Sequence, residues 1–319
     1  MPDCVLGIDT SCYTTSVALA SSGRIVFSER KLLSVPDGER GLRQADGVFQ
    51  HVKALPALLG KLLDEAPDAV INAVCVSSRP RDREDSYMPV FTTGEAFAQS
   101  IAASLRVPLF KTSHQQGHIR AALVDSGVPT GKFVALHLSG GTTQTVLTDE
   151  NLAITEIGGT SDLNAGQLVD RTGVLMGLHF PCGPELEKLA VKGESRSLIP
   201  VSKDKLTVSF SGAENKVKQL LESGETYENT AMEVYHFLSR SIAHLVVNAA
   251  HEAKVKQVLL AGGVASSRLL RELLPARVKK LDSNIKLHFG KPELSGDNAC
   301  GVALIGYGLL TGGTYGTDY

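Results

Sequence analysis

The sequence predicts an α/β fold built from two related lobes. Apolar strands alternate with segments of helical periodicity along the whole chain, which is the pattern of α/β proteins. A hairpin also occurs twice, as VLGIDTSCYTTSVAL at 5–19 and as VALHLSGGTTQTVL at 134–147. In each copy a turn of small residues joins two apolar strands. The copies lie about 130 residues apart, which is too long for a solenoid repeat and suits two lobes.

The first third of the chain is predicted to alternate between strands and helices. In chain order we expect a hairpin over 4–29, a helix over 46–64, a buried strand over 69–78, a helix over 93–105, a short strand over 107–110 and a helix over 113–127. The polar, Gly-rich segment before residue 46 is expected to be a loop. Pro56 can kink or break the first helix, because proline removes a backbone donor.

The remainder of the chain continues the same alternation. We expect helices around 162–178 and 184–191, a strand and turn over 206–212, a helix over 227–253, a strand, Gly-Gly turn and helix over 255–274, a strand over 286–289 and a last helix over 297–310. We place the lobe boundary near residue 113. The N-terminal lobe is then 1–113 and the C-terminal lobe 114–297, and the final helix within 298–319 can pack back on the first lobe.

Composition narrows the class of protein. With 319 residues, 43% of them hydrophobic, the chain can bury two lobes. Its net charge of −2 argues against a non-specific nucleic-acid binder, although a local basic surface is compatible with it. The five dispersed cysteines form no C-x-x-C pair, and the apolar stretches are too short to span a bilayer. We therefore expect a cytoplasmic protein with no signal peptide and no membrane partner.

Both hairpin turns have the features of a phosphate site. Small side chains let backbone N–H groups approach an anion, and hydroxyl groups add donors. Each turn carries a Thr-Thr pair, Thr14-Thr15 in the first and Thr142-Thr143 in the second. Two ordinary hairpins are the alternative interpretation. The duplication favours two turns that hold a polyphosphate.

A histidine pair predicts a metal site. His114 and His118 lie four residues apart in SHQQGHIRAAL, so a helix places both imidazoles on one face, with Cβ atoms about 5–6 Å apart. One divalent cation can take a nitrogen from each ring. A solvated or capping pair has the same spacing. Asp297, in SGDNAC, is a candidate third ligand, and a plain N-cap of the final helix is its alternative role.

Three further groups of residues are candidates for binding. Gly262 and Gly263 would let a phosphate or a flat ligand approach a helix N-terminus, or would serve a tight turn that needs a positive φ. Asp170 and Gly183 could contact ribose hydroxyls, or be an ordinary surface Asp and a loop Gly. A basic cluster could bind nucleic acid, or form the solvated face of a helix; it consists of Arg268, Arg271, Arg277, Lys279 and Lys280.

Several motifs in this order resemble one family. They are GIDTSC, H-x-x-x-H at 114–118, LSGGTTQ at 138–144, LVDRTGVLMGLHFPCGPELEKLA at 168–190, SFSG, AGGVAS and DNACGVALIGYG. Together they are similar to the TsaD family, the tRNA threonylcarbamoyladenosine transferases once described as O-sialoglycoprotein endopeptidases. The resemblance covers nearly the whole chain. It implies the actin-like ATPase fold of sugar kinases and chaperone ATPases, with two duplicated ribonuclease-H-like lobes.

The resemblance also implies roles for individual residues. His114, His118 and Asp297 match the family's ligands for a metal ion, iron or zinc. The substrate loop on the phosphate side and the nucleoside contacts match a larger set: Leu138, Ser139, Gly140, Gly141, Thr142, Asp170, Gly183, Gly262, Gly263 and Ser267. Asp9, Ser11 and the 139–143 loop, which includes Thr143, would then bind the phosphates of an ATP- or AMP-type nucleotide. The family transfers a threonylcarbamoyl group from its adenylate to an adenosine of tRNA, usually with partner proteins.

Four departures from the family pattern suggest a divergent paralogue. Tyr13 and Thr14 replace acidic residues of the first turn, and Thr142 replaces a histidine. Ser267 stands where the family has Asn, and the charged segment RPRDREDSYMP at 79–89 replaces a Gly-Pro-Gly-Leu loop. The fold and a nucleotide site tolerate these changes better than the transfer reaction does.

These observations leave several functions open. The leading hypothesis is a metal- and nucleotide-binding TsaD-like protein with threonylcarbamoyl or related carbamoyl transfer, acting on tRNA or another acceptor. A non-catalytic paralogue that binds nucleotide and acts through a homologous partner or as a dimer is the alternative, as is an ATPase. A peptidase is disfavoured, because the sequence has no G-x-S-x-G motif and no clear pair of nucleophile and base.

Overall fold

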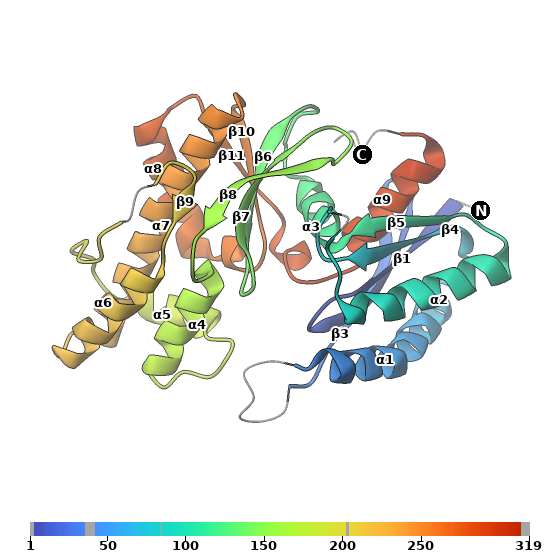
Figure 1. Cartoon of the computed structure of the whole chain (residues 1–319), viewed down its shortest axis with the longest axis horizontal. Helices are drawn as coiled ribbons and strands as arrows, with labels where there is room; N and C mark the ends of the chain where they lie inside the picture. Colours follow the sequence, from blue (N-terminus) through green and yellow to red (C-terminus); the bar gives the residue numbers. More distant parts are fainter. Residues whose placement is uncertain (1–2, 36–41, 84, 202–203, 314–319) are drawn as a thin grey trace. The chain divides into compact units, whose positions relative to one another are not determined.

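The computed structural model describes residues 3–35, 42–83, 85–201 and 204–313. It forms two compact units (Figure 1). Unit 1 consists of Met1–Val124, Glu150–Ile154 and Gly296–Tyr319, and unit 2 of Asp125–Asp149 and Thr155–Ser295. This division differs from the boundary expected at residue 113. The helix that carries the two candidate histidines packs against the last helix of the chain, so both belong to unit 1.

Unit 1 contains a five-stranded sheet and four helices in the described residues. They are β1 (Asp3–Thr10), β2 (Thr14–Ser21), β3 (Arg24–Leu32), α1 (Gln44–Glu65), β4 (Val70–Arg79), α2 (Pro89–Leu105), β5 (Leu109–Ser113), α3 (His114–Leu123) and α9 (Cys300–Thr311). The strand order is β3-β2-β1-β4-β5. The hairpin strands β1 and β2 are antiparallel, whereas β4 and β5 continue in parallel with β1.

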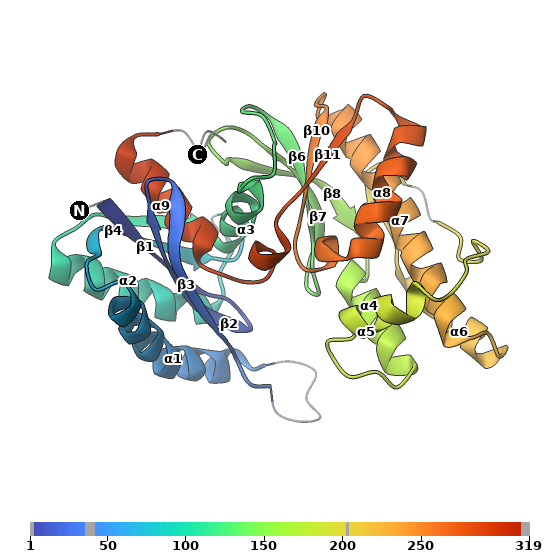
Figure 2. The same ribbon diagram turned by 180° about the vertical axis from the view of Figure 1, so that it is seen from behind.

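Helices cover both faces of this sheet. In Figures 1 and 2, α1 and α2 lie on one face, and α3 and α9 on the other. The central strands are therefore buried on both sides, which explains their nearly continuous runs of apolar and small residues. Helix α1 runs across Pro56 without the break that its sequence allows, and presents His51, Leu55 and Leu62 to the interior. Strand β3, at the edge, is mostly exposed.

Unit 2 contains a six-stranded sheet and five α-helices in the described residues. They are β6 (Phe133–Leu138), β7 (Thr143–Thr148), β8 (Ile154–Thr160), α4 (Ala165–Leu175), α5 (Gly183–Ala190), β9 (Thr207–Val208), α6 (Ser211–Glu222), α7 (Tyr227–Glu252), β10 (Gln257–Ala261), α8 (Arg268–Leu281) and β11 (Lys286–Phe289), with two 3₁₀ turns, η1 (Val264–Ser266) and η2 (Pro292–Leu294). The strand order is β11-β10-β6-β7-β8-β9.

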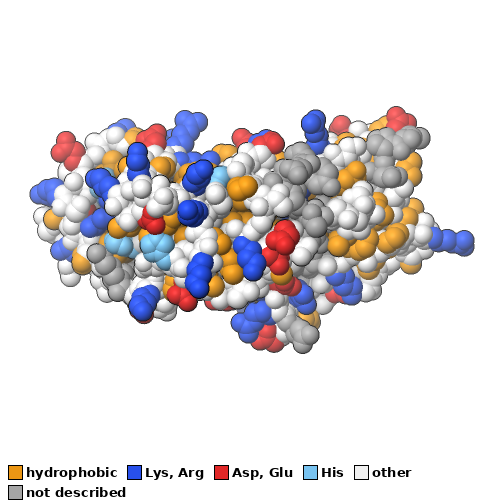
Figure 3. Space-filling view, turned by 90° about the horizontal axis from the view of Figure 1, so that it is seen from above, with side chains coloured by type: hydrophobic (Ala, Val, Ile, Leu, Met, Phe, Trp, Pro, Cys, Tyr) orange, Lys and Arg blue, Asp and Glu red, His pale blue; other side chains and the backbone are white. Residues whose placement is uncertain are grey.

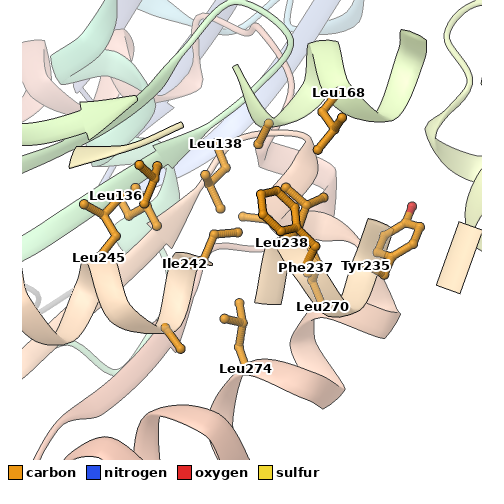
Figure 4. Close-up of a cluster of buried hydrophobic side chains, with 14 of the residues drawn as sticks. Leu136, Leu138, Leu168, Tyr235, Phe237, Leu238, Ile242, Leu245, Leu270 and Leu274 are labelled. Atoms are coloured by element: carbon orange, nitrogen blue, oxygen red, sulfur yellow. The ribbon is translucent and has the colours of Figure 1, made fainter. Parts of the chain in front are cut away.

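The core of unit 2 is centred on α7, which packs against the sheet and against α8. Figure 4 shows Leu136 and Leu138 of β6 pointing toward Leu238 and Ile242 of α7. Leucines of α8 complete the cluster from the other side. Tyr235 belongs to the same buried set, but its hydroxyl points away from the apolar centre. The packing of the buried residues of α7 against the sheet and α8 therefore fixes the orientation of this helix.

The two sheets repeat one topology. In unit 1 an antiparallel hairpin, β1 and β2, is followed by β4 and β5 in parallel with β1. In unit 2 the hairpin of β6 and β7 is flanked in the same way by β10 and β11. Even the turns match, because Ser11 N–H donates to the Thr14 carbonyl (3.0 Å) and Ser139 N–H to the Thr142 carbonyl (2.8 Å). The repeated hairpin thus reflects a duplicated lobe.

Within the described part of the chain, no helix combines the length and the apolar character needed to cross a membrane.

Candidate functional site

Unit 1 brings the three candidate metal ligands together. His114 Nε2 lies 3.0 Å from His118 Nε2, and Asp297 Oδ1 lies 3.6 Å from the first nitrogen and 3.2 Å from the second. These three are the one group of His, Cys, Asp and Glu side chains within the described residues whose ligand atoms converge in this way, all within 4.8 Å of one another. Asp297 is not the N-cap of α9, a position held by Ala299, and its carboxylate is directed to the histidines instead.

Helix geometry explains this convergence. Helix α3 begins at His114, directly after the capping residue Ser113, so both histidines lie in its first turns. Two glycines, Gly117 of α3 and Gly301 of α9, let these helices approach closely. A Cβ at Gly301 would overlap the Gly117 carbonyl oxygen. The close crossing brings the start of α9, and with it Asp297, next to the histidines. Sequence analysis missed this pair, although both glycines interrupt otherwise helical patterns.

Asp9 orients the first histidine. Its carboxylate is fully buried at the end of β1, where Oδ1 accepts hydrogen bonds from Ser77 Oγ and from His114 Nδ1 (2.8 Å). The bond to Nδ1 leaves Nε2 of His114 facing His118. A carboxylate behind a histidine in this way is the usual outer support of a metal ligand. Asp9 was expected to contact phosphate, but its burial and its bond to His114 favour this orienting role.

The first hairpin turn holds the carboxylate ligand. Ser11 Oγ donates to Asp297 Oδ2 at 2.7 Å. The turn is itself held by His51 of α1, whose Nε2 contacts the Ser11 carbonyl (3.0 Å) and whose Nδ1 contacts Thr15 Oγ1 (2.7 Å). His51 is fully buried and its pKa is lowered by burial, so it serves as a neutral link. No sequence pattern identified it.

The pKa values of His114 and Asp297 depend strongly on the charged groups around them. Burial by itself lowers the pKa of His114, but the charge of Asp9 and the hydrogen bonds that His114 donates to both carboxylates hold that pKa well above its ordinary value. Burial likewise raises the pKa of Asp297, but hydrogen bonds from His114 and His118 hold it well below its usual range.

The donor set suits a borderline transition metal. Two imidazole nitrogens and one carboxylate oxygen are ligands that zinc and iron accept, with open positions left for substrate. The buried Oδ2 of Asp9 has no hydrogen-bond partner within the described residues, so unit 1 has more negative charge at this point than its own donors satisfy. The residues present therefore fit an iron or zinc ion.

The second hairpin turn is exposed, whereas the first contacts the side chain of Asp297. Gly140 and Gly141 are exposed, and a Cβ at either would meet no atom within 4 Å. The start of α4 closes on this turn, since Gly166 N–H donates to the Ser139 carbonyl (3.2 Å) and Ala165 N–H to Thr143 Oγ1 (2.8 Å). The loop at 138–143 thus places exposed glycine backbone beside the start of α4, where the helix dipole favours negative charge.

Candidate nucleoside contacts also gather within unit 2. Tyr235 Oη donates to the Gly183 carbonyl (3.3 Å), and the Cys182 N–H donates to Asp170 Oδ1 (2.9 Å). Ser267 Oγ donates to Glu187 Oε1 at 3.0 Å. Burial raises the pKa of Asp170, which has no cationic partner in the described residues. Glu187 and Tyr235 were not singled out from the sequence.

The glycine turn after β10 is required by close packing. Gly262 has φ +96°, and a Cβ there would overlap the Leu138 carbonyl oxygen. Gly263, next to it, has open space around its Cα. Gly262 therefore holds the end of the second hairpin against β10, whereas Gly263 is free to meet a ligand.

The departures from the family pattern lie at distinct places. Thr14 is buried and Tyr13 is half exposed, so neither supplies an acidic group at the first turn. Thr142, at the second turn, is partly exposed. The described part of the 79–89 segment packs next to α3, since Gln115 N–H donates to the Pro80 carbonyl (3.0 Å) and Gln116 Nε2 donates to Asp82 Oδ2 (3.3 Å).

Comparisons with solved structures define the fold. The chain is similar to T. kodakarensis HypF, with a TM-score of 0.61 and 16% identity. The match covers 98% of this chain and 48% of HypF. It is also similar to the activator of 2-hydroxyisocaproyl-CoA dehydratase from Clostridium difficile with bound ADPNP (TM-score 0.53, 14% identity, 97% and 96% covered). A ROK family glucokinase from Streptomyces griseus in complex with glucose and AMPPNP gives a TM-score of 0.54 at 10% identity, with 95% and 99% covered. These likenesses confirm the actin-like ATPase fold.

Sequence relatives are closer. A protein of Thermus thermophilus described as tRNA N6-adenosine threonylcarbamoyltransferase is 32% identical over 311 residues, covering 94% of this chain and 91% of the relative. A Staphylococcus aureus protein with the same description is 28% identical over 331 residues, covering 98% and 93%. The family model described as "TsaD: tRNA N6-adenosine threonylcarbamoyltransferase" matches residues 48–304. Since this model spans most of the chain, the chain belongs to the TsaD family.

Proposed function

We propose that this chain transfers a threonylcarbamoyl group to an adenosine of tRNA, the reaction in the description of its family. One observation supports the proposal most directly. Two histidines and a carboxylate form a cluster that could hold iron or zinc, and these residues are His114, His118 and Asp297. The reaction needs an adenylate as donor, and the open loop of unit 2 offers backbone donors for its phosphate. A cytoplasmic location and a homologous partner or a dimer belong to the same proposal.

The residues of unit 1 would keep the metal site in one geometry. A bound metal ion would supply Lewis-acid polarisation of a carbonyl group. Asp9 holds the proton on His114 Nδ1, which keeps Nε2 available as a ligand. Ser11 holds Asp297 in place through Oδ2, and His51 holds the Ser11 turn. Each link reduces the reorganisation that metal binding would otherwise require.

In unit 2, separate groups would bind the nucleotide. Gly140 and Gly141 are exposed and a Cβ at either would meet no atom within 4 Å, so a phosphate could approach their backbone closely. Asp170 and Glu187 offer carboxylate oxygens to ribose hydroxyls, because both lie within one cluster with Gly183 and Ser267. Gly263 leaves room for a flat base beside the backbone.

A second candidate function is nucleotide binding without transfer. It is favoured by one observation, that Tyr13 and buried Thr14 leave the first turn without acidic groups. A protein of this kind would act through association with a relative, or hydrolyse ATP slowly.

Metal content and product formation test the proposal together. The full chain, a His118→Ala variant and a His251→Ala control are purified, and metals are measured by mass spectrometry. His251 is a matched control, because it also contacts a carboxylate, Asp282, at 2.7 Å but has no second histidine beside it. We expect about one iron or zinc per chain in the parent and control. An Asp9→Asn variant should bind the metal about 10- to 100-fold more weakly.

The same preparations are then given unmodified tRNA and threonylcarbamoyl-adenylate. We expect modified adenosine, detected by nucleoside mass spectrometry, from the parent and from His251→Ala, and little from His118→Ala. Equal metal content in the parent and His118→Ala would rule out the metal site. Metal and tight nucleotide binding without modified adenosine would favour the second candidate.

A further inference from the structure

Three basic side chains meet between α7 and α8 on unit 2. His236 and Arg240 lie four residues apart on one face of α7, and Arg277 comes from α8. Arg277 Nη2 donates to His236 Nδ1 at 3.2 Å. Arg240 donates through Nη2 to the Ile199 carbonyl (2.6 Å) and through Nε to the His236 carbonyl (3.4 Å). All three side chains are partly exposed.

The two arginines of this cluster have no ion-pair partner within the described residues, although the charge of Glu233 raises the pKa of His236 against the larger effect of burial. Among the ion pairs of the described residues, none involves Arg240 or Arg277. The nearest acid on α7 is Glu233, which is buried and accepts both the Arg196 N–H and the Leu198 N–H (2.9 Å). Its charge is thus already used by the loop before β9. Nη1 of each guanidinium makes no hydrogen bond within the described chain.

Holding two guanidinium groups together without an anion costs free energy. Burial, and then the charge of Arg240, lower the pKa of Arg277, which shows that the two cations interact. Nε of Arg277 is buried and has no hydrogen-bond partner within the described residues, and a buried unpaired donor is unfavourable. Such an arrangement would be favourable if an anion bound to it. Paired guanidinium forks match the oxygens of a phosphate group.

The other basic residues of α8 do not share this arrangement. Arg271 is held inside, since its Nε donates to the Ala265 carbonyl (2.9 Å) and its Nη2 to the Gly290 carbonyl (2.5 Å). Arg268, Lys279 and Lys280 are simply exposed. On the face shown in Figure 3, Lys and Arg side chains are scattered among acidic and apolar ones and form no continuous basic surface. The cluster of His236, Arg240 and Arg277 has the size of a site for one phosphate group.

We propose that His236, Arg240 and Arg277 bind a backbone phosphate of RNA. The choice of RNA rests on the proposed function, whereas the match to a phosphate group rests on the cluster itself. This site is separate from the contact of Ser267, because Ser267 is the N-cap of α8 and Arg277 follows it by about 15 Å of helix axis. It would fix a part of the tRNA away from the reacting adenosine.

Binding of tRNA as a function of salt tests the site directly. The full chain is compared with Arg240→Gln/Arg277→Gln and with the control Lys254→Gln/Lys279→Gln, which loses the same charge from exposed positions of unit 2. We expect the arginine variant to bind tRNA about tenfold more weakly. Its slope of log affinity against log salt should fall by about 1 per lost phosphate contact. The lysine control should change much less, and thermal melting shows whether each variant is folded.

A second measurement needs no variant of the arginines. The His236 imidazole resonance, assigned with His236→Asn, is followed in the parent protein during titration with inorganic phosphate or with tRNA, each at constant ionic strength. A shift with tRNA supports the RNA phosphate site. A shift with inorganic phosphate alone, and unchanged tRNA affinity in the arginine variant, overturns RNA as its source. No shift with either, together with equal losses in both double variants, overturns the site. If the parent does not bind tRNA at all, the proposed function fails instead.

Discussion

The two hairpin turns share a backbone but differ in what fills them. In unit 1 the turn carries Cys12 and Tyr13, and its Ser11 hydroxyl is bonded to Asp297. In unit 2 the corresponding turn carries Gly140 and Gly141, both exposed and next to empty space. The same Ser N–H to Thr carbonyl bond closes both turns. One copy of the duplicated hairpin thus supports the candidate cation site, and the other leaves its glycine backbone exposed.

The neighbours of each turn explain the difference. In unit 1 the strand that leads into the turn ends beside α3, so that Asp9 reaches His114. In unit 2 the turn meets the start of α4 instead, where a Cβ on Gly166 would lie 2.6 Å from the Gly140 Cα. A helix N-terminus favours negative charge, whereas a pair of histidines favours a metal ion. The chemistry of each turn follows from the helix packed against it.

The largest effect is expected from a glycine that supports the second turn. Gly262→Ala places a Cβ against the Leu138 carbonyl and forces alanine to adopt φ +96°, so we expect a loss of about 2–4 kcal/mol. Gly263→Ala, with open space and a negative φ, should cost within about 1 kcal/mol. Chemical denaturation measures both. Equal stability of the two variants would show that β10 does not hold the second hairpin.

A serine pair tests the two turns directly. Ser11→Ala removes a hydrogen bond to a carboxylate, and bonds to charged groups contribute about 1.5–3 kcal/mol. We expect a loss in that range in metal-free protein, together with weaker metal binding. Ser139→Ala removes a hydroxyl that makes no hydrogen bond within the described residues, and should change stability by less than about 0.5 kcal/mol. Similar losses at both serines would contradict the difference between the turns.

Local sequence patterns predicted part of the fold and of the candidate metal site. The strands, the repeated turn and the helical face shared by His114 and His118 follow from the spacing of residues close in sequence. Asp297 lies far from them along the chain, so the sequence alone left it open between a third ligand and an N-cap, and the resemblance favoured the ligand. Its approach to the histidines depends on a helix crossing that Gly117 and Gly301 permit, and sequence spacing does not report such a crossing.

Burial explains what the sequence did not reveal. Asp9 was read as a phosphate contact because it stands beside a turn of small residues, yet the order β1-β4-β5 places its carboxylate between Ser77 and His114. His51 lies in a helix whose pattern marks it only as inward-facing. Both residues act through partners at least 36 residues away. Such contacts depend on strand order and helix packing, which periodicity leaves undetermined.

The smallest expected effect is a change in the pH dependence of stability. It is compared between one aspartate of unit 1, Asp297, and one of unit 2, Asp170. In unit 1, histidines hold the pKa of Asp297 low. Asp170 of unit 2 has no such partner, and burial raises its pKa. The folded state therefore binds a proton on Asp170 more readily than the unfolded state does. The cost of its charge is present above the raised folded pKa and disappears as the pH falls below the ordinary value of 3.8.

Asp170→Asn should consequently melt above the parent at pH 7, with the difference vanishing toward pH 3.5, since the amide oxygen can still accept the Cys182 N–H. Solvent screening of this partly exposed group keeps the gain below about 1 kcal/mol. Asp297→Asn in metal-free protein should have the opposite sign, because a lowered pKa contributes stability above 3.8 that is lost as the pH falls through the lowered value. Thermal melting across pH measures both variants. The same sign for both variants would mean that Asp297 of unit 1 and Asp170 of unit 2 have similar electrostatic surroundings, contrary to the opposite directions of their pKa values.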